Sequence, residues 1–281
     1  MPGTLYVVAT PIGNLEDITL RALRVLREVT LIAAEDTRRT ARLLQHYSIS
    51  TPTTSLHEHN EHRKSRALVD RLLAGESIAL VTDAGTPVVS DPGASLVAAA
   101  HAAGIRVEPI PGPSAAMAAL SASGVSAEQF VFLGFPPPRS GDRRRWLLDV
   151  ADETRPLILF EAPHRLKQTL KDALEILGDR RVVMGRELTK AHEELVVRQI
   201  SELLGTDQDP RGEYTLIITP PERPVESASA VDPERLLTEF CHMTNNDGLA
   251  PKIAVKELAR RYALPSRTVY AVVHKQRESG E

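Results

Sequence analysis

Residues Val81–Gly93 read VTDAGTPVVSDPG, and Pro109–Met117, one helix-length later, read PIPGPSAAM. Each stretch begins as a short apolar strand and ends in a run of Gly, Pro, Asp, Ser and Thr, whose loops expose backbone N–H and C=O groups. We expect the two strands to be neighbours in a parallel sheet, with both loops at the carboxyl edge, where open α/β sheets bind ligands. Because proline and glycine fix the shape of such loops, the sequence predicts a site that holds a small molecule largely through rigid backbone.

On either side of these loops, the first part of the chain alternates between strand and helix patterns. Apolar runs predict five strands, at Leu5–Ala9, Leu31–Ala34, Thr53–Leu56, Ile78–Val81 and Val107–Ile110. The segments between them carry apolar residues at helical spacing. The run Ile78–Val81 is apolar throughout, as expected of a strand that is covered on both faces. Five such units predict an α/β domain with a parallel sheet over residues 1–113.

A second α/β domain is predicted over residues 114–220. Its strands are expected at Phe130–Leu133, Leu157–Phe160, Val182–Met184, Leu195–Ile200 and Tyr214–Ile218. Helices are expected at 143–150 and 166–177 but not between all the strands, so this sheet should be mixed. The stretch 221–232 is rich in Pro, Ser and Glu, which is typical of a linker. Three further helix patterns predict a small helical extension over residues 233–281.

Composition narrows the class of protein. The 281 residues carry a formal net charge of -3, with 42% hydrophobic and 25% charged residues, which is ordinary for a globular protein. No overall field draws such a chain to nucleic acid, so contact with phosphate needs a local basic patch. Cys241 is the only cysteine, which excludes an intramolecular disulfide and a cysteine zinc site. We find no export signal and no bilayer-length apolar stretch, and we expect a cytoplasmic protein without a membrane partner.

Two common phosphate-binding motifs are absent. The chain contains no G-x-x-x-x-G-K-[ST], which disfavours P-loop chemistry. After the first strand, TPIGN (Thr10–Asn14) stands where a G-x-G-x-x-G is expected, which disfavours a Rossmann dinucleotide enzyme or a Rossmann-type methyltransferase. TPIGN is either a helix-initiating loop capped by Asn14 or part of the mouth of the cleft, and the two roles are compatible.

Polar clusters mark the loops where chemistry is expected. The first, EDTR at Glu35–Arg38, places two carboxylates and a guanidinium at the end of a buried strand, where unpaired charges are costly. An Asp36–Arg38 ion pair, with Thr37 capping the next helix, is one explanation. A substrate-positioning role, with Arg38 on a phosphate, is the other.

Two more clusters follow. In HEHNEH at His57–His62, His57 and His59 are predicted to share one strand face, a pattern compatible with metal binding. No further Cys or His set completes a coordination shell, so we expect no metal and favour a polar lining for RNA or cofactor. RELTK at Arg186–Lys190 combines a carboxylate and an amine after a strand of the second domain.

Positive charge collects in two places. From Leu249 to Glu281 there are seven Lys/Arg against three Glu, within two helix patterns joined by Leu-Pro-Ser in the manner of a helix-turn-helix. The loop PRSGDRRRW at Pro138–Trp146 adds four arginines and an aromatic ring that is able to stack on a base. A charge run is usually a solvated face, but in an acidic protein this excess favours phosphate contact.

Together, these stretches resemble the tetrapyrrole-methylase superfamily, the class III S-adenosylmethionine-dependent methyltransferases. The matching segments span nearly the whole chain: VATPIGNLEDIT (Val8–Thr19), IAAEDTR (Ile32–Arg38), LHEHNE (Leu56–Glu61), VTDAGTPVVSDPG, PIPGPSAA, FEAPHR (Phe160–Arg165), RELTK and GEYTLII (Gly212–Ile218). Within the superfamily, the match is to the branch that 2′-O-methylates a cytidine of 16S rRNA. The resemblance implies two α/β domains with S-adenosylmethionine in the cleft between them, a helical extension, a homodimer, and the small ribosomal subunit as partner, with no DNA expected.

The resemblance and the charge patterns together assign residue roles. Cofactor contacts are expected from Pro11, Asp83, Gly85, Thr86, Ser114, Ala115, Glu161, Leu188, Glu213 and Tyr214. Contacts with RNA are expected from Asn14, Arg38, His57, Asn60, Arg144, Lys256, Arg260 and Arg267. The attacking ribose hydroxyl must lose a proton, and the candidate acceptors, unranked, are Glu187, Lys190, Glu35 and Asp36.

Two other functions stay open at this point. A tetrapyrrole C-methyltransferase of the precorrin type keeps the chemistry but needs a sizeable apolar trough and has no use for a basic extension, and the 4% aromatic content argues against it. A nucleic-acid-binding regulator that senses a metabolite uses the helix-turn-helix pattern, but it leaves the EDTR, HEHNE and RELTK clusters without a purpose.

Overall fold

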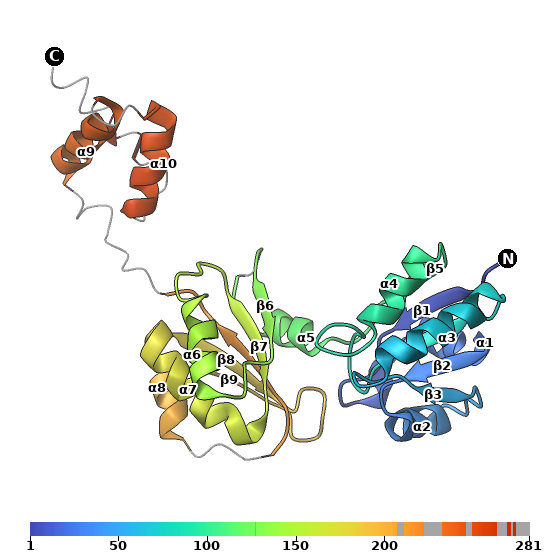
Figure 1. The fold of residues 1–281 in the computed structure, drawn as a ribbon. Coiled ribbons are helices and arrows are strands. Elements are labelled where there is room, and N and C mark those ends of the chain that lie inside the picture. Colours follow the sequence, from blue (N-terminus) through green and yellow to red (C-terminus); the bar gives the residue numbers. More distant parts are fainter. Residues whose placement is uncertain are drawn as a thin grey trace. The chain divides into compact units, whose positions relative to one another are not determined.

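The structure is a computed structural model of the 281-residue chain. It describes residues 1–126, 128–206, 211–221, 232–245, 249–262, 269–270 and 272–273, without the side chains of Lys252, Lys256 and Arg260. The chain divides into two compact units, Met1–Pro220 and Pro221–Glu281. The first unit contains two five-stranded sheets, so it holds both predicted α/β domains, and their boundary at residue 113 stays a prediction (Figure 1).

The first sheet is parallel throughout and has the order β3-β2-β4-β1-β5. Its strands are β1 (Thr4–Val8), β2 (Leu31–Ala34), β3 (Thr53–Ser55), β4 (Ile78–Val81) and β5 (Arg106–Ile110). The intervening helices are η1 (Leu15–Asp17, a 3-10 turn), α1 (Leu20–Glu28), α2 (Thr37–His46), α3 (Glu61–Leu73) and α4 (Ala94–Ala102). The five predicted strands are confirmed to within one residue at each end.

Both faces of this sheet are buried. Alternate residues of β2 point to opposite faces: Ile32 belongs to a core formed with α1 and α2, and Leu31 to a core formed with α3 and α4. The four residues of β4 divide between the same two cores. This double cover explains why these strands are continuously apolar in the sequence.

One expectation about this sheet is wrong. β4 and β5 are not neighbours, because β1 lies between them and pairs with both: Val8 stands opposite Val81 on one side and Ile110 on the other. Strand order depends on contacts between distant segments, which the local apolar pattern does not encode. The loops after β4 and β5 therefore flank the TPIGN loop after β1.

The second sheet is mixed, as predicted, and has the order β6-β7-β10-β8-β9. Its strands are β6 (Val131–Gly134), β7 (Leu157–Glu161), β8 (Arg181–Arg186), β9 (Glu194–Gln199) and β10 (Tyr214–Ile218). Only β6 and β7 pair in parallel, and the other three pairs are antiparallel. The helices of this part are α5 (Ala115–Ala122), α6 (Ser140–Leu148), α7 (Pro163–Leu177) and α8 (Ile200–Gly205).

The helices cover the second sheet unequally (Figure 1). Apolar residues of α6, α7 and α8 form one large core with one face of the strands. The small helix α5 packs on the other face through Ala116 and Ala119, together with a group of phenylalanines. Two details differ from expectation. α8 was not predicted, and α6 begins at Ser140, so most of PRSGDRRRW is helix and not loop.

The second unit has a core of its own. It contains α9 (Pro233–Asn245) and α10 (Pro251–Arg261), and its core includes Leu258 of α10 together with Val269 and Val273. The two predicted apolar faces of the helix-turn-helix pattern therefore meet. The linker at 222–231, most of the third predicted helix and Arg267 lie outside the described residues, as do the side chains of Lys256 and Arg260. Among the described helices, none is both long and apolar enough to cross a membrane.

Candidate active site

Three loops meet at the carboxyl edge of the first sheet. Thr10 and Gly85 exchange two backbone hydrogen bonds, at 2.8 and 3.0 Å, so the loops after β1 and β4 are held together. Thr86 Oγ1 donates to the Pro113 carbonyl at 3.2 Å, which ties the loop after β4 to the loop after β5. Gly85 has a φ of +93°, a conformation that favours glycine. The loops are therefore fixed by hydrogen bonds to one another, although they do not follow neighbouring strands, and their role in holding a small molecule stays a prediction.

Two adjoining cavities open here. The main cavity, of about 380 Å³, contains eight of the ten predicted cofactor residues: Asp83, Gly85, Thr86, Ser114, Ala115, Glu161, Glu213 and Tyr214. The side cavity, of about 390 Å³, contains Pro11 and shares Ile12, Arg39, Asp83, Ala84 and Glu213 with the main one. Leu188 lines neither cavity. It packs instead in the apolar group on the α5 face of the second sheet.

Five carboxylates line the main cavity, and three of them, Glu35, Asp83 and Asp91, come from loops of the first sheet. Glu35 Oε2 accepts hydrogen bonds from Thr82 Oγ1 at 2.7 Å and from the Asp83 backbone N–H at 3.1 Å. Asp83 Oδ1 accepts from the backbone N–H of Asp36 at 3.0 Å. The nearest cation is Arg39, whose Nη1 lies 3.5 Å from Asp83 Oδ2. The loops thus hold the carboxylates in place mainly by neutral donors.

Crowding of these carboxylates changes their protonation. Burial raises the pKa of Asp91 to about 6, and the negative charges of Glu35 and Asp83 act in the same direction, against a hydrogen bond from Thr82. Burial and the charge of Glu35 also raise the pKa of Asp83, although Arg39 opposes them. A raised carboxyl pKa means that the ionised form is unfavourable where it stands. A cation bound in the cavity would relieve that cost.

The loop that carries Asp91 has a strained backbone. Val88 and Ser90 have φ of 75° and 66°, a region that a β-branched residue rarely adopts. The end of the loop is fixed by Glu61, a buried carboxylate of α3 whose Oε1 accepts from the backbone N–H groups of Gly93 at 3.1 Å and Ser95 at 2.6 Å. Strain of this kind persists where the surroundings enforce it and is concentrated at functional sites.

The RELTK loop reaches the TPIGN loop from the second sheet. Lys190 Nζ lies 2.9 Å from Glu187 Oε1 and 3.1 Å from Glu213 Oε2, and Thr189 Oγ1 accepts from the Asn14 N–H at 3.1 Å. Burial acts to lower the pKa of Lys190, but the two carboxylates raise it overall. Burial acts to raise the pKa of Glu187, but Lys190 lowers it overall. Both groups are therefore held in their charged forms.

EDTR has a structural role at its second carboxylate. Asp36 Oδ1 caps α2 by accepting from the Arg38 N–H at 2.8 Å, and Asp36 Oδ2 pairs with Arg38 Nη2 at 2.8 Å. Hydrogen bonds from the Arg38 side chain and backbone hold the pKa of Asp36 far below its ordinary value. The expected ion pair is present, but the cap is Asp36 and not Thr37. Neither Asp36 nor Arg38 lines a cavity.

The histidine cluster lies in a turn. β3 ends at Ser55, so His57 and His59 do not share a strand face, contrary to expectation. Asn60 closes the turn instead: its Oδ1 accepts from the His57 N–H at 3.0 Å, and its Nδ2 lies 2.9 Å from His57 Nε2. His57 and Asn60 line neither cavity. Among the described residues, no three His, Cys, Asp or Glu side chains are grouped as metal ligands.

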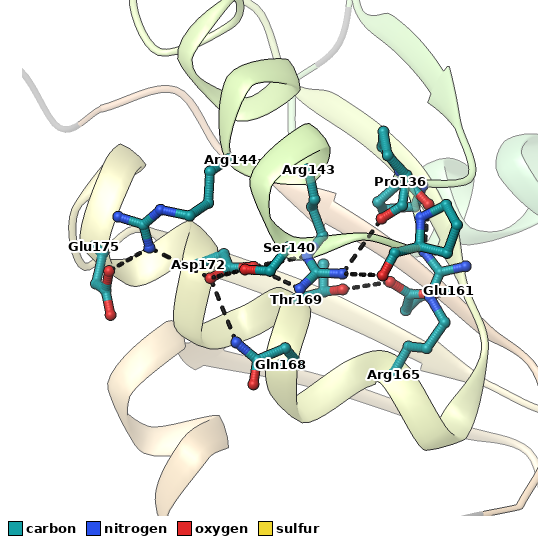
Figure 2. A network of polar contacts seen from close by, with 12 residues as sticks. Pro136, Ser140, Arg143, Arg144, Glu161, Arg165, Gln168, Thr169, Asp172 and Glu175 are labelled. Carbon is teal, nitrogen blue, oxygen red and sulfur yellow. Dashed lines mark hydrogen bonds and ion pairs between the residues drawn. The ribbon is translucent and has the colours of Figure 1, made fainter.

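The arginines of α6 are committed to carboxylates (Figure 2). Arg143 is buried and pairs with Asp172 of α7, with 2.6 Å between Nη2 and Oδ2. Arg144 contacts Asp172 and Glu175 of the same helix. The ring of Trp146 packs against the core of the second sheet. Arg143 is therefore unavailable for the RNA contact that its sequence position indicated, while contacts of Arg144 and of the half-buried Trp146 with RNA stay predictions.

Among the residues that line the main cavity and that sequence reasoning did not assign to the site are Arg39, Asp91, Phe135 and Phe160. Asp91 stands within the stretch that decided the fold, beside Pro92 and Gly93, so its position after β4 was a usable signal. Phe135 directly precedes three prolines, an unusual place for a solvent-exposed aromatic residue. Arg39 carried no signal beyond its nearness to EDTR.

Comparisons with known proteins agree with this geometry. The sequence profile of the Tetrapyrrole (Corrin/Porphyrin) Methylases matches residues 4–204. The chain belongs to this family. The chain is 44% identical to a ribosomal RNA small subunit methyltransferase I from Halalkalibacterium halodurans, over 98% of this chain and 96% of that protein. It is 46% identical to a protein of the same name from Synechocystis sp., over 95% of this chain and 96% of the other.

The fold of this chain also resembles that of proteins whose structures have been solved. Uroporphyrin-III C-methyl transferase from Thermus thermophilus, in complex with S-adenyl homocysteine, matches it with a TM-score of 0.55 and 19% identity, over 77% of this chain and 97% of the other. The predicted superfamily and its α/β fold are therefore confirmed.

Proposed function

We propose that this protein transfers a methyl group from S-adenosylmethionine to the 2′-oxygen of a cytidine ribose in 16S rRNA of the small ribosomal subunit. The observation that carries the proposal is the match, over nearly the whole chain, to relatives called ribosomal RNA small subunit methyltransferase I. The cytidine and its 2′-oxygen come from the family resemblance of the sequence motifs. The cavity at the carboxyl edge of the first sheet supports the cofactor independently of any name.

The main cavity fits S-adenosylmethionine in charge and in size. When bound, this cofactor supplies a methyl group on a positively charged sulfur. Glu35, Asp83 and Asp91 offer negative charge to that sulfur and to the amino group of the methionine part. The backbone at Gly85 and Thr86 is held rigidly enough to position the rest of the ligand. A volume of about 380 Å³ is in the range of small-molecule sites.

Asp91 is our candidate for the group that accepts the proton of the 2′-hydroxyl. Of the four acceptors proposed from sequence, Asp36 caps a helix and has a lowered pKa, and Lys190 is held protonated by a raised pKa. Glu187 is tied to Lys190. Glu35 lines the cavity but already accepts two hydrogen bonds. Asp91 lines the cavity with a pKa of about 6, close to the value at which a carboxylate is an efficient base.

Neither alternative function is favoured by a specific observation. A tetrapyrrole substrate calls for a broad apolar trough, whereas the main cavity has carboxylates at Glu35, Asp83, Asp91, Glu161 and Glu213. A metabolite-sensing regulator has no need for a strained loop that presents a carboxyl group of raised pKa. The rRNA assignment accounts for both the cavity and the match along the second unit.

The remaining assignments follow from the substrate and, for the homodimer, from the family resemblance. The proposal includes a homodimer and a cytoplasmic location, where ribosomal subunits are assembled. It also includes contacts with RNA from Asn14, Arg38, His57, Asn60, Arg144, Lys256, Arg260 and Arg267. Sedimentation of the purified protein tests the dimer. A mass equal to a single chain at working concentration would remove it from the proposal.

One experiment tests the function directly. Methyl transfer from labelled S-adenosylmethionine is measured on small ribosomal subunits that lack the modification, and 2′-O-methylation is mapped by nucleotide. We expect label at one cytidine of 16S rRNA. Absence of label on subunits and on free rRNA, from a protein that binds S-adenosylhomocysteine, would contradict the proposal and favour the tetrapyrrole alternative.

A further inference from the structure

An exposed phenylalanine stands at the rim of the main cavity. Phe135 follows β6 directly and lines the cavity together with the carboxylates, yet it is 54% exposed. Single exposed apolar side chains are ordinary on a protein surface. This one is different because it lines a cavity that also contains five carboxylates, and because the backbone around it is fixed.

The ring of Phe135 is backed by other aromatic rings. Its centroid lies 5.4 Å from that of Phe160, in a tilted arrangement, and Phe160 in turn meets Phe132 edge-on at 5.2 Å. Phe160 also lines the main cavity, and both Phe132 and Phe160 pack in the α5-side core of the second sheet. Phe135 is thus the outermost ring of an aromatic stack rooted in the core.

Two arginines immobilise the segment that carries this ring (Figure 2). Arg165 of α7 donates to the carbonyl of Pro136. Arg143 of α6 donates to the carbonyls of Pro137 at 3.3 Å and Pro138 at 3.2 Å. Arg143 is itself buried and anchored by Asp172. The proline rings fix φ, and each of the three proline carbonyls accepts a hydrogen bond from a guanidinium group. The segment therefore has little conformational entropy to lose when a ligand binds to Phe135.

We propose that Phe135 is the stacking platform for the base of the nucleotide whose ribose is methylated. This inference rests on the proposed function, because it takes RNA as the substrate. A ribose hydroxyl can reach the transferred methyl group only if its nucleotide enters the cavity, and its base then leaves its neighbours in the RNA. An aromatic ring restores the lost stacking, and single-stranded RNA is commonly held this way.

The exposed position of Phe135 indicates that its ring contacts the base of the substrate and not the adenine of the cofactor. The buried part of the cavity lining includes Tyr214 and Glu161, and the half-buried carboxylates Glu35, Asp83 and Asp91 suit the charged parts of the cofactor. Phe135 is at the exposed rim, on the path of an incoming nucleotide. Because a ring face recognises any planar base, Phe135 contributes affinity and placement without discriminating between bases.

The test compares Phe135→Ala, Phe135→Leu and Phe135→Tyr in the full chain. Single-turnover methylation of unmodified small subunits is measured at saturating S-adenosylmethionine, and the affinity for S-adenosylhomocysteine is measured by calorimetry. We expect Phe135→Ala to raise the subunit concentration for half-maximal rate by about 5- to 150-fold, with S-adenosylhomocysteine binding unchanged. Phe135→Leu, which keeps apolar volume without a ring, should resemble Ala, and Phe135→Tyr should resemble the wild type.

Leu148→Ala provides the matched control, since Leu148 is exposed on α6 and lines neither cavity. A loss of S-adenosylhomocysteine affinity in Phe135→Ala, with subunit dependence unchanged, would assign the ring to the cofactor and overturn the inference. Wild-type behaviour of Phe135→Ala or Phe135→Leu would overturn it as well. These outcomes all require an active wild type. A wild type that binds S-adenosylhomocysteine but methylates no subunit would instead overturn the proposed function, and the platform with it.

Discussion

Thr10 and Gly85 exchange backbone hydrogen bonds across the loops that follow β1 and β4, with N–O distances of 2.8 and 3.0 Å. This bridge joins the TPIGN loop to the loop that carries Asp83 and Asp91, and Thr86 extends the connection to the loop after β5. Because the contacts are between backbone atoms, their geometry depends on conformation more than on side-chain identity. The exception is Gly85, whose φ of +93° restricts the residue.

Gly85→Ala should therefore weaken cofactor binding. The added Cβ meets ordinary van der Waals distances, with Ile12 Cγ2 at 3.5 Å, so the cost comes from the backbone and not from a clash. We expect a loss of about 1–2 kcal/mol in the free energy of unfolding and a higher Kd for S-adenosylhomocysteine by calorimetry. Gly104→Ala is the control: φ is +68° and nothing lies within 4 Å of its Cβ. It should lose similar stability without a change in Kd.

The acidic cavity should make cofactor binding depend on pH. Asp91 has a pKa of about 6 in the free protein, so acidification below that value removes a negative charge from the cavity. The Kd of S-adenosylmethionine, whose sulfur is positively charged, should rise as pH falls from about 7 to 5. The Kd of S-adenosylhomocysteine, whose sulfur is uncharged, should rise less. Asp91→Asn should flatten the difference. Equal pH profiles for the two ligands in the wild type would count against the role of the cluster.

Asp91 also predicts a pH dependence of stability. Its folded pKa is raised from the ordinary 3.8, so the folded state binds the proton more tightly than the unfolded state. This contribution is complete below the unfolded pKa and is lost as pH rises through about 6. At neutral pH, Asp91→Asn should increase the free energy of unfolding by no more than about 1 kcal/mol, because the carboxyl is partly solvated. The Tm of the variant should therefore be modestly higher than that of the wild type. Thermal scans at several pH values of both proteins test this, and a lower Tm in the variant at neutral pH contradicts it.

Lys190 should act through its charge and not as a base. Its pKa is raised overall by Glu187 and Glu213, despite burial, so it is protonated at neutral pH. Lys190→Arg should then keep activity to within about tenfold, whereas Lys190→Met leaves two carboxylates unpaired and should bind substrate less well. Steady-state kinetics on small subunits distinguishes the two roles: a base loses about 10²- to 10⁴-fold in kcat in either variant.

The Arg143–Asp172 pair should be essential to the fold of the second sheet. Both side chains are at most 3% exposed, so removing one partner leaves a buried charge. Arg143→Met should cost about 3–5 kcal/mol of unfolding free energy. Arg145→Ala, on the same helix, removes an exposed pair with Asp142 and should change stability by less than about 0.5 kcal/mol. Urea unfolding measures both, and similar midpoints for the two variants would show that the buried pair is dispensable.

Removal of the second unit should separate cofactor binding from substrate binding. The core of that unit includes Leu258 and Val269 and shares no residue with the cores of the first unit. A chain that ends at Pro220 should fold and bind S-adenosylhomocysteine as the full chain does. Its methylation of small subunits should need a higher subunit concentration. Unchanged kinetics on subunits would show that the basic extension does not contact rRNA.

The sequence was sufficient for the strands of both sheets. Residues such as Ile32 and Leu80 are buried on opposite faces of a covered sheet, and that burial requires continuous apolar runs, which can be recognised locally. Strand order was not accessible, since β1 carries no local sign that it lies between β4 and β5. The parallel sheet was predicted correctly and one of its neighbour relations wrongly for this reason.

The candidate site was predicted unevenly. Loops dense in Gly, Pro and Asp were found because such residues are rare in strand and helix interiors, and eight of the ten expected cofactor residues line the main cavity. Charged residues were harder. EDTR contains one carboxylate that faces the cavity, Glu35, and one that caps a helix, Asp36, and only three-dimensional contacts distinguish them. The sequence did not identify Phe135, because the exposure of a side chain depends on the tertiary structure.

The central place of β1 has a consequence for synthesis of the chain. β1 leaves the ribosome before its partners β4 and β5, which end at Val81 and Ile110. About 110 residues must therefore be translated before both edges of β1 can be paired. Until then at least one edge of β1 is unpaired, a state that favours association with other chains. A pause in translation before Ile110 should increase the demand for chaperones, whereas a pause after it should have little effect.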